Sequence, residues 1–357
     1  MELSKKDTNR YSRHLLLDKV GVKGQLKLKQ AKVLVIGAGG LGCPVLQYLG
    51  AAGVGEIGVV DFDVIDESNL QRQILFSVED IGKSKSETAK LKLEAQNPLI
   101  TVIAYDLELT NENAIDLFKQ YDIIVDGTDN FSTRYMVSDA CVLTDKPLVY
   151  GAIHKFEGQV SVFNYKNGPT YRCLFPNPPE LGSMPSCSEV GVIGVLPGII
   201  GTQQANEVLK MILEIGKVMS GELLIYNSLD PSFLQLKINK SANLSDIGIN
   251  SIYDFEEFDY SLTCEIYNEG FTKIDLEKLP SSTFVLDVRE EWETPKVENK
   301  TVLNILLDEL DDNVNKIPKK DTIYVVCQRG GRSQVAIDFL KAEYNFTNLI
   351  NVEGGVG

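Results

Sequence analysis

Short apolar segments alternate with helical periodicity along most of the chain. Residues 32–36, 56–60, 101–105 and 123–125 are apolar and rich in β-branched side chains, which predicts buried strands. The stretches between them, and residues 194–211, carry the spacing of helices. Strands that alternate with helices predict a parallel sheet that is covered on both faces.

Two further stretches, residues 156–164 and 222–238, alternate apolar with polar side chains and predict strands of an antiparallel extension. Between them, the proline-rich residues 176–185 cannot form regular structure and are expected to be a mobile loop. Residues 1–29 are expected to form a helical arm. The expected fold class is therefore α/β, with a Rossmann-like, mostly parallel sheet and an antiparallel extension.

The composition changes after Lys240. Residues 241–272 hold seven acidic side chains and no lysine or arginine, which is typical of a solvated linker. A second α/β pattern then begins, with predicted strands at 284–286 and 323–326 and a predicted helix at 333–340. The expected organisation is a first domain over 1–240, an acidic linker over 241–266 and a smaller α/β domain over 267–357.

The overall composition limits the classes of function. The 357 residues suffice for about two domains, and a net charge of -15 disfavours general binding to nucleic acid or anionic membranes. No apolar run approaches the roughly 20 residues that span a bilayer, and the polar N-terminus does not resemble a signal peptide. Six cysteines are too few for a disulfide scaffold. We therefore expect a soluble, cytoplasmic protein with reduced thiols.

A glycine-rich turn follows the first predicted strand. Residues 37–42, with the sequence GAGGLG, fit the G-x-G-x-x-G pattern between a strand and a helix. The glycines allow the backbone to approach a phosphate, and the helix N-terminus attracts its negative charge. Asp61 lies 19 residues after Gly42, at the end of the next strand, where a carboxylate can bind ribose hydroxyls. On this motif alone, a nicotinamide dehydrogenase is the first interpretation.

Cations beyond Asp61 change that interpretation. The segment 68–73, SNLQRQ, supplies Arg72, and Lys85 follows it. Two cations near a nucleotide suit a triphosphate whose charge must be neutralised during displacement. Asp129, in the motif GTDN, closes another strand, where an aspartate can hold a magnesium ion against the phosphates.

With GAGGLG, Asp61, SNLQRQ, Lys85 and GTDN in this order, the chain resembles the ThiF/MoeB family of adenylyltransferases, which activate ubiquitin-like sulfur carriers. The likeness runs from about Arg10 to Ile238. It implies ATP and Mg²⁺ at the site, and Arg13 matches an arginine that the family inserts into the neighbouring subunit, which implies a homodimer. Arg72, Lys85 and Asp129 are the expected catalytic residues, and Asp129 is the expected metal ligand. The residues that the resemblance assigns to ATP binding are Arg13, Gly37, Gly39, Gly40, Gly42, Asp61, Ser68, Asn69, Arg72, Gln73, Lys85, Asp129 and Asn130.

Three cysteines of the first domain receive separate interpretations. Cys187 belongs to the predicted mobile loop, where the family carries a cysteine that accepts the activated acyl group or resolves a disulfide. Loop exposure suits a reactive thiol, and an unreactive loop cysteine is the alternative. Cys43 and Cys141 lie on apolar helical segments and are expected to be core residues.

Many family members bind structural zinc through two C-x-x-C pairs, and this chain departs from them. The first pair would be Thr170 and Cys173, so its leading cysteine is missing, and the second pair is absent. Cys264 stands alone, and the chain has two histidines, His14 and His154. No tetrahedral set of ligands remains, so we predict no structural zinc.

A second candidate reactive cysteine, Cys327, ends a predicted strand and precedes a predicted helix. Loop amides, a helix N-terminus and two nearby arginines suit a bound anion such as a persulfide. Together with Asp287-Val288-Arg289, this pattern resembles a rhodanese sulfurtransferase domain over 267–357. The expected persulfide loop consists of Cys327, Gln328, Arg329, Gly330, Gly331, Arg332 and Ser333.

A protein phosphatase uses a similar cysteine-to-arginine loop and is the rival interpretation. Its loop is one residue longer than the four residues, Gln328 to Gly331, that separate the two here, which favours sulfur. An inactive rhodanese fold is a further alternative. Residues 293–304 lack the family's histidine-proline-glycine stretch, and a rhodanese continues with a closing helix after the glycines at 354–355. The second domain is therefore expected to be abbreviated or truncated.

The two resemblances together predict a reaction. The first domain adenylates the C-terminal glycine of a ubiquitin-like sulfur carrier ending in Gly-Gly, Cys327 accepts sulfur from an upstream persulfide donor, and its persulfide displaces AMP. Cys187 then releases the thiocarboxylate by forming a disulfide with Cys327. Molybdopterin synthesis, thiamin synthesis and tRNA thiolation all fit this scheme. The alternatives are activation of a tRNA-linked carboxylate, a nicotinamide dehydrogenase, and a non-catalytic scaffold for a ubiquitin-fold partner.

Overall fold

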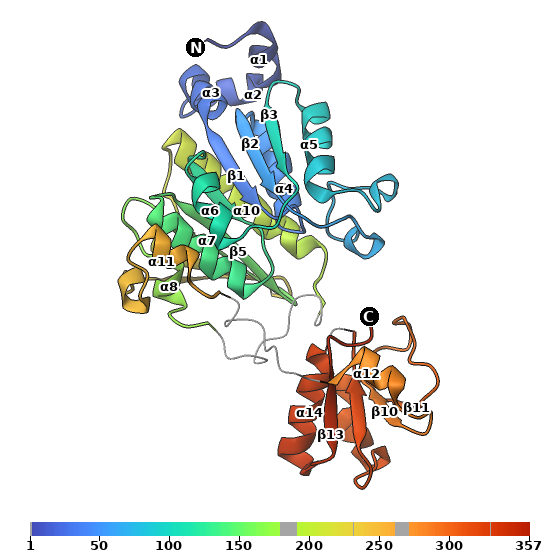
Figure 1. Ribbon diagram of the computed structural model, residues 1–357. Helices are drawn as coiled ribbons and strands as arrows, with labels where there is room; N and C mark the ends of the chain where they lie inside the picture. Colours follow the sequence, from blue (N-terminus) through green and yellow to red (C-terminus); the bar gives the residue numbers. More distant parts are fainter. Residues whose placement is uncertain (1, 179–190, 231, 261–270, 329) are drawn as a thin grey trace. The chain divides into compact units, whose positions relative to one another are not determined.

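The computed structural model describes residues 2–178, 191–230, 232–260, 271–328 and 330–357. Within these ranges, the residues through 260 form one compact unit and those from 271 form a second (Figure 1). Each unit has its own sheet and its own apolar core, as expected for separate domains.

The first unit is built on an eight-stranded sheet. Five parallel strands lie in the order β3 (Thr101–Tyr105), β2 (Glu56–Val60), β1 (Lys32–Ile36), β4 (Ile123–Asp126) and β5 (Leu148–His154). Three antiparallel strands follow, β6 (Glu157–Phe163), β7 (Glu222–Asn227) and β8 (Ser232–Lys237). The predicted fold class is confirmed. Strand β5 was not predicted from the sequence, and β7 and β8 were predicted as one stretch.

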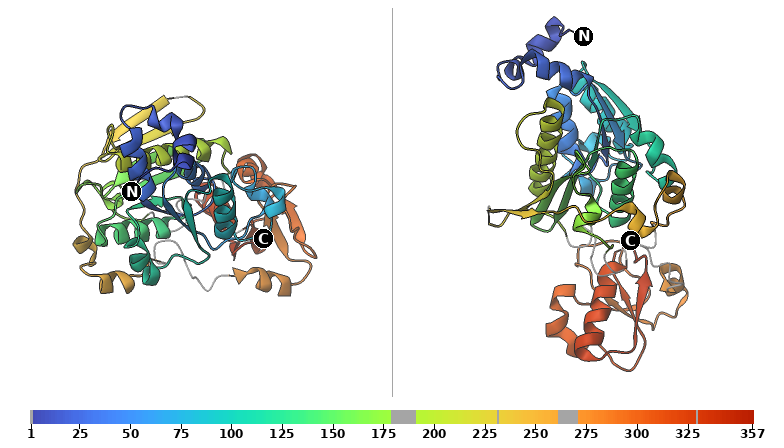
Figure 2. Two further views of the ribbon diagram at one scale, coloured as in Figure 1. Left: turned by 90° about the horizontal axis from the view of Figure 1, so that it is seen from above. Right: turned by 90° about the vertical axis from the view of Figure 1, so that its left-hand side faces the viewer.

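Helices cover both faces of this sheet (Figures 1 and 2). One face carries α3 (Gly21–Gln30), α4 (Gly42–Ala52), α5 (Lys85–Gln96) and α10 (Val195–Leu213), and the other carries α6 (Asn111–Phe118), α7 (Phe131–Leu143), α8 (Tyr171–Leu174) and α11 (Ile252–Glu256). The helical arm begins with α1 (Lys5–Arg10) and α2 (Ser12–Leu15). None of the helices in the described ranges is both long enough and apolar enough to cross a bilayer.

The uninterrupted apolar run of β1 follows from this double cover. Successive side chains of a strand point to opposite faces. Val33 and Val35 pack into the core beneath α4 and α10, whereas Leu34 and Ile36 pack into the core beneath α6 and α7. Both faces of β1 are therefore buried, and no polar position is tolerated within its centre.

Residues 244–260 continue the first unit, which differs from the expected linker at 241–266. Leu244 and Phe255 are buried in the core that α6 and α7 share, and the Tyr260 hydroxyl donates a hydrogen bond to Asp139 Oδ2 at 2.8 Å. The stretch is mostly acidic and polar, so its few apolar positions did not form a pattern that predicts packing against the core. The described part of the first unit therefore extends to residue 260 rather than ending at 240.

The second unit is a five-stranded parallel sheet. Its strands lie in the order β11 (Thr301–Asn304), β10 (Phe284–Asp287), β12 (Ile323–Val326), β13 (Leu349–Glu353) and β9 (Phe271–Thr272). One face packs against α14 (Gly331–Tyr344) and α13 (Leu310–Asn313), and the other packs against α12 (Lys273–Lys278). The predicted smaller α/β domain is confirmed.

Candidate functional site

The polar motifs of the first unit meet at the carboxyl edge of its parallel strands. β2 and β4 are the two neighbours of β1, so the segments that follow these three strands adjoin one another. They are the glycine turn after β1, Asp61 after β2, and residues 127–130 after β4. Ligands of open α/β sheets bind at this edge, where the direction of strand order reverses.

The glycine turn is too tightly packed for side chains at two positions. Gly37 has a left-handed φ of 89°, and a Cβ there would lie 2.9 Å from the Gly127 carbonyl oxygen. A Cβ on Gly42, the first residue of α4, would lie 1.9 Å from the Gly37 carbonyl oxygen. Glycine at these positions lets the turn bring the N-terminus of α4 close to a bound anion.

Asp61 holds the glycine turn in place. Its Oδ2 accepts a hydrogen bond from the Ala38 amide at 2.7 Å, and its Oδ1 accepts one from the Asp63 amide at 2.9 Å. Burial raises the pKa of the Asp61 carboxyl, and the Lys85 ammonium and the two amides oppose this rise. The carboxylate lies at the end of β2, where such a group can bind ribose hydroxyls.

Two cations lie beside the turn. The Arg72 Cγ would lie 3.5 Å from a Cβ on Gly40, and its Nη1 donates to the Ser68 carbonyl oxygen at 3.0 Å. The buried Lys85 Nζ donates to Asp63 Oδ2 at 2.7 Å. Asp63 itself is exposed, so the Lys85 ammonium is kept at the site by a counter-ion that remains in contact with water.

The turn after β4 is held by a buried ion pair. Asp126 Oδ1 accepts hydrogen bonds from the Thr128 amide at 2.9 Å and the Thr128 hydroxyl at 2.6 Å. Arg134 Nη2 donates to the Thr128 carbonyl oxygen at 2.9 Å, and Arg134 Nε lies 3.8 Å from Asp126 Oδ2. Asp126 and Arg134 are buried, whereas Asp129 in the same turn is exposed. Asp126 and Arg134 therefore hold the turn in place, while the Asp129 carboxylate faces water.

Several other predicted ATP ligands also have local partners. Asn130 Oδ1 accepts the Thr133 amide at 2.8 Å and caps α7. Ser68 donates through its amide and its hydroxyl to Asp66 Oδ1, at 2.8 and 2.6 Å. Gln73 is buried beside the glycine turn. These contacts give Asn130 and Ser68 a structural role in addition to the predicted one.

Arg13 is not brought to this edge within one chain. It is exposed on α2, which packs against α3, and α3 leads into the amino end of β1 (Figure 1). The glycine turn lies at the opposite, carboxyl end of β1. The predicted role of Arg13 in a neighbouring subunit's site stays a prediction.

Two cysteines of the first unit belong to its core. Cys43 and Cys141 are fully buried, which confirms their predicted positions. Burial raises the pKa of Cys43 to about 12, so this residue remains a thiol at neutral pH although it follows the glycine turn. Cys187 lies outside the described residues, and its predicted reactivity stays a prediction.

The position of the missing zinc ligands contains a hydrogen-bonded sulfur. Cys173 Sγ accepts hydrogen bonds from the amides of Thr170, Ser241 and Ala242, each at 3.4 Å. Burial opposes ionisation, but these donors and the Thr170 hydroxyl hold the pKa of Cys173 below its ordinary value. No group of three or more His, Cys, Asp or Glu in the described ranges could hold a metal. One sulfur does not fit tetrahedral zinc, and the absence of structural zinc stays a prediction.

In the second unit, a loop encloses Cys327 between β12 and α14. The buried Cys327 Sγ accepts a hydrogen bond from the Gly330 amide at 3.1 Å, and Ser333 Oγ lies 3.4 Å from it. Gly330 has a φ of 92° and is the N-cap of α14, so the chain turns back over the sulfur. Asn351 on β13 accepts a hydrogen bond from Ser333 Oγ at 2.6 Å. Arg329 lies outside the described residues.

Two arginines of this second site are each paired with a carboxylate. Arg332 Nη1 and Nη2 donate to Glu293 Oε1 and Oε2 at 2.7 and 2.6 Å. Arg289 Nε and Nη2 donate to Asp287 Oδ1 and Oδ2 at 2.9 and 2.8 Å. From the sequence, Arg332 is expected to stabilise an anion beside Cys327. The structure instead commits both Nη groups of Arg332 to Glu293.

Three charged residues at these sites were not predicted from the sequence: Asp63, Arg134 and Glu293. Asp63 follows the singled-out Asp61 by two residues, so its position was a usable signal. Arg134 lies only six residues after Thr128, but nothing in the helical sequence around it marks it as a partner of Asp126. Glu293 lies 39 residues before Arg332 and among other acidic residues, so this pairing becomes visible only in the folded chain.

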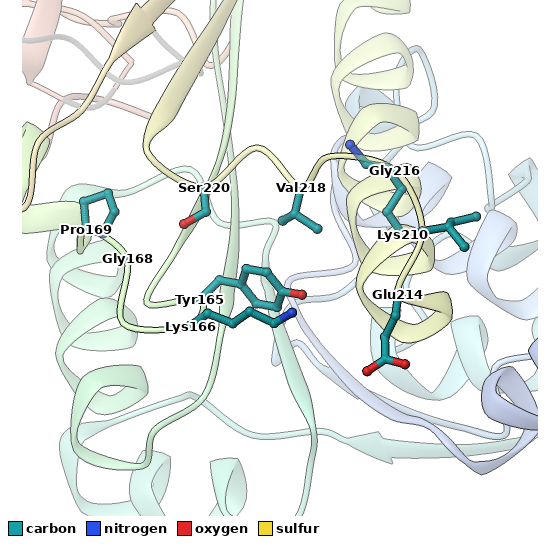
Figure 3. Close-up of a pocket in the computed structure, with 10 residues that line it drawn as sticks. Tyr165, Lys166, Gly168, Pro169, Lys210, Glu214, Gly216, Val218 and Ser220 are labelled. Carbon is teal, nitrogen blue, oxygen red and sulfur yellow. The ribbon is translucent and has the colours of Figure 1, made fainter.

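A separate pocket of about 380 Å³ lies at the other edge of the first sheet (Figure 3). Tyr165 follows the end of β6, which pairs with the amino end of β5. Two charged residues of the pocket lining already have partners, because Lys210 pairs with Glu207 and Glu214 pairs with Lys27. The pocket contains none of the predicted site residues. Its lining is formed by Tyr165, Lys166, Gly168, Pro169, Lys210, Glu214, Ile215, Gly216, Val218 and Ser220.

Comparison with known proteins gives extensive matches. The ThiF family matches residues 11–246. The probable adenylyltransferase/sulfurtransferase MoeZ of Mycobacterium tuberculosis (strain ATCC 25618 / H37Rv) is 41% identical, over 99% of this chain and 93% of that protein. The sulfur carrier protein adenylyltransferase of Thermus thermophilus is 49% identical, over 72% of this chain and 98% of that protein. The adenylyltransferase and sulfurtransferase MOCS3 of Aedes aegypti is 38% identical, over 95% of this chain and 83% of that protein.

A solved structure supports the same assignment for the first unit. The crystal structure of E. coli MccB with ATP aligns with a TM-score of 0.57 at 26% identity and covers 67% of this chain and 73% of that chain. The family match includes the glycine turn, Asp61, Lys85 and Asp129. The chain belongs to the ThiF family.

Proposed function

We propose that this protein adenylates the C-terminal glycine of a ubiquitin-like sulfur carrier and then transfers sulfur to it from Cys327. The chain is an enzyme with adenylyltransferase and sulfurtransferase activities, in line with relatives that it matches over nearly their whole length. The observation that carries the proposal is the presence in one chain of an open nucleotide edge and an enclosed cysteine. These two sites suit successive steps, activation of a carboxylate and delivery of sulfur.

The first step is adenylation at the carboxyl edge of the first sheet. A carboxylate oxygen of the carrier attacks the α-phosphorus of ATP, and pyrophosphate leaves. The glycine turn and the N-terminus of α4 bind phosphate oxygens, and Asp61 binds the ribose. Arg72 and Lys85 neutralise the charge that develops during displacement. Positioning and charge stabilisation carry this step, since the protein forms no covalent bond in it.

Asp129 is the residue that would hold Mg²⁺. Its carboxylate is exposed on a turn that Asp126 and Arg134 anchor, and oxygen ligands of this kind suit a hard cation. When bound, the metal would neutralise phosphate charge.

The second step is sulfur transfer. The persulfide sulfur on Cys327 attacks the acyl carbon of the adenylate, AMP leaves, and the carrier is joined to Cys327 through a disulfide bond. The Cys187 thiolate then attacks Cys327 Sγ, which forms the Cys187–Cys327 disulfide and releases the carrier as a thiocarboxylate. The Gly330 amide and the N-terminus of α14 support the negative charge on the Cys327 sulfur.

The partners follow from these steps. The carrier ends in Gly-Gly, and an upstream persulfide donor loads Cys327. A homodimer would place Arg13 of one chain at the nucleotide edge of its neighbour. The exposed position of Arg13, away from the glycine turn of its own chain, supports this arrangement.

ATP–pyrophosphate exchange tests the proposal, with candidate carriers added one at a time and each compared with a control that lacks its terminal glycine. We expect exchange with one carrier and none with its truncated form. Subsequent formation of a thiocarboxylate, detected by mass spectrometry, would establish the second step. Absence of exchange with every carrier ending in Gly-Gly would contradict the proposal and favour a tRNA-linked carboxylate or a non-catalytic scaffold.

A further inference from the structure

The loop around Cys327 adjoins a short segment that carries Glu293. Glu293 Oε1 accepts the Glu290 amide at 3.0 Å, and the Gln328 side chain donates to the Thr294 carbonyl oxygen at 3.1 Å. The segment therefore has a hydrogen bond within itself and another to Gln328 in the loop that follows Cys327. Its acidic side chain has a defined position beside the sulfur-accepting loop.

Glu293 occupies the hydrogen-bonding edge of Arg332. The two Nη groups bond the two carboxylate oxygens at 2.7 and 2.6 Å, and the side chains are only 16% and 10% exposed. A bidentate pair of this kind holds the guanidinium in one orientation. Burial raises the pKa of Glu293, but Arg332 and the Glu290 amide outweigh this and leave it below its ordinary value. Glu293 is therefore ionised at neutral pH and cancels the charge of Arg332.

The neighbouring arginine is neutralised in the same way. Arg289 is bonded through Nε and Nη2 to Asp287, and its Nη1 donates to Gln328 Oε1 at 3.2 Å. In the described part of this site, the Gly330 amide donates to the sulfur, and the Ser333 hydroxyl, which donates to Asn351 Oδ1, lies 3.4 Å from it. These are neutral groups, which suit a single negative charge on sulfur better than a dianion.

We propose that Glu293 determines the class of sulfur donor: by neutralising Arg332 it disfavours donors that release an oxyanion and favours persulfide donors that release a thiolate. The inference rests on the proposed role of Cys327 as the sulfur acceptor. It assigns to a single residue, Glu293, the preference for a persulfide donor that the proposed reaction already invokes.

The two donor classes differ in the group that leaves. With thiosulfate, the Cys327 thiolate attacks the outer sulfur, the S–S bond breaks, and its electron pair departs on the sulfite dianion. With a persulfide, the thiolate attacks the terminal sulfur, and the electron pair departs on the donor's thiolate, which carries one charge. Both reactions leave a persulfide on Cys327. Departure of the dianion demands more nearby positive charge, and Glu293 removes it from Arg332.

The test measures the rate at which the full chain gains one sulfur atom on Cys327, followed by mass spectrometry. The two probes are thiosulfate and cysteine persulfide. Glu293→Gln removes the carboxylate charge and weakens its hold on Arg332, whereas Glu291→Gln removes the same charge from an exposed side chain two residues away. We expect Glu293→Gln to raise the thiosulfate rate about tenfold relative to Glu291→Gln, and to change the persulfide rate by less than about twofold.

Three results would overturn the inference. A thiosulfate rate in Glu293→Gln equal to that in Glu291→Gln would exclude a role for the pair. In the unmodified chain, thiosulfate loading as fast as persulfide loading would also contradict it, even if Glu293→Gln failed to fold. If neither probe loads Cys327 in the unmodified chain, the proposed function of Cys327 fails and the donor inference fails with it.

Discussion

The glycine turn of the first unit and the Cys327 loop of the second each follow a buried parallel strand and lead into a helix. Each contains a glycine in the left-handed region, Gly37 at a φ of 89° and Gly330 at 92°. The first turn carries no reactive side chain, and its charged groups come from other segments, such as Arg72 and Lys85. The second encloses the atom that we propose to react, the buried Cys327 sulfur.

In the proposed reaction, the two loops bind different reactants. The site of the first loop accepts two external reactants, which fits the exposed carboxylates of Asp129 and of Asp63, the counter-ion of Lys85. The second loop would hold one reactant covalently on Cys327, and among the described residues its arginines are matched with carboxylates, as in Arg332 with Glu293. The same backbone geometry is therefore found in an open, charged site and in a buried site whose described charges are paired.

The largest expected effect comes from a substitution that abolishes the proposed reaction at the second loop and leaves the reaction at the first loop unchanged. Cys327→Ser should abolish thiocarboxylate formation, because a hydroxyl cannot carry the sulfur as a persulfide, and should leave ATP–pyrophosphate exchange intact. Mass spectrometry of the carrier and an exchange assay on the same preparation measure the two outcomes. Normal thiocarboxylate yield from this variant would show that the sulfur enters elsewhere.

A reciprocal change in the first site should be nearly as large. Asp129→Asn removes the proposed metal ligand, and we expect exchange to fall about 10²- to 10³-fold, the usual loss for a group that stabilises transition-state charge. Loading of Cys327 from cysteine persulfide should remain unchanged. An exchange rate close to that of the unmodified chain would remove Asp129 from the catalytic set.

Two buried arginines allow a finer test, because each pairs with a buried aspartate and each pair includes one residue of α7. Arg134, on α7, pairs with Asp126, whereas Arg172 bonds Asp139 through Nε and Nη2 at 2.8 and 2.7 Å. Arg134→Lys and Arg172→Lys should each lower the free energy of unfolding by about 1–3 kcal/mol. Only Arg134→Lys should slow exchange, by about tenfold, since it alone anchors the turn of Asp129.

Chemical denaturation and the exchange assay check this pair of variants. An equal loss of exchange in both would mean that Arg134 acts through stability alone. A loss confined to Arg134→Lys, together with an increased Mg²⁺ requirement, would identify it as a positioning residue.

The smallest expected effect is a pH dependence of the second unit. The pKa of Glu293 is lower in the folded state than its ordinary value of 4.5, so its pairing with Arg332 stabilises the fold above that value. This stabilisation is lost as pH falls through the folded-state pKa. Urea denaturation between about pH 7 and pH 3 should show this loss, on the order of 1 kcal/mol or less, in the unmodified chain and not in Glu293→Gln. Identical pH profiles would contradict the assignment.

The features that sequence patterns predicted share a local origin. β1, the glycine turn and α4 are adjacent in the chain, and so are β12, Cys327 and α14. Apolar runs and glycine spacing record such strand-loop-helix units directly. For this reason, the fold class and the segments that form both candidate sites could be predicted from the sequence.

What the sequence did not predict depends on contacts between distant segments. Glu293 and Arg332 are 39 residues apart, and nothing in the acidic run around Glu293 distinguishes it from Glu290 or Glu291. Similarly, the apolar character of Leu244 and Phe255 was hidden within an acidic stretch. Burial and ion pairing arise only when the sheets bring these partners together.

The packing of residues 244–260 onto α6 and α7 limits the length of chain between the two units. Tyr260 is the last residue of the first unit that the structure describes, and the residues between it and β9 number fewer than in a connection beginning at 241. For sites joined by a short covalent connection, the effective concentration of one at the other is on the order of millimolar and depends on that length. Lengthening the stretch after Tyr260 would lower this concentration without altering a residue of either site.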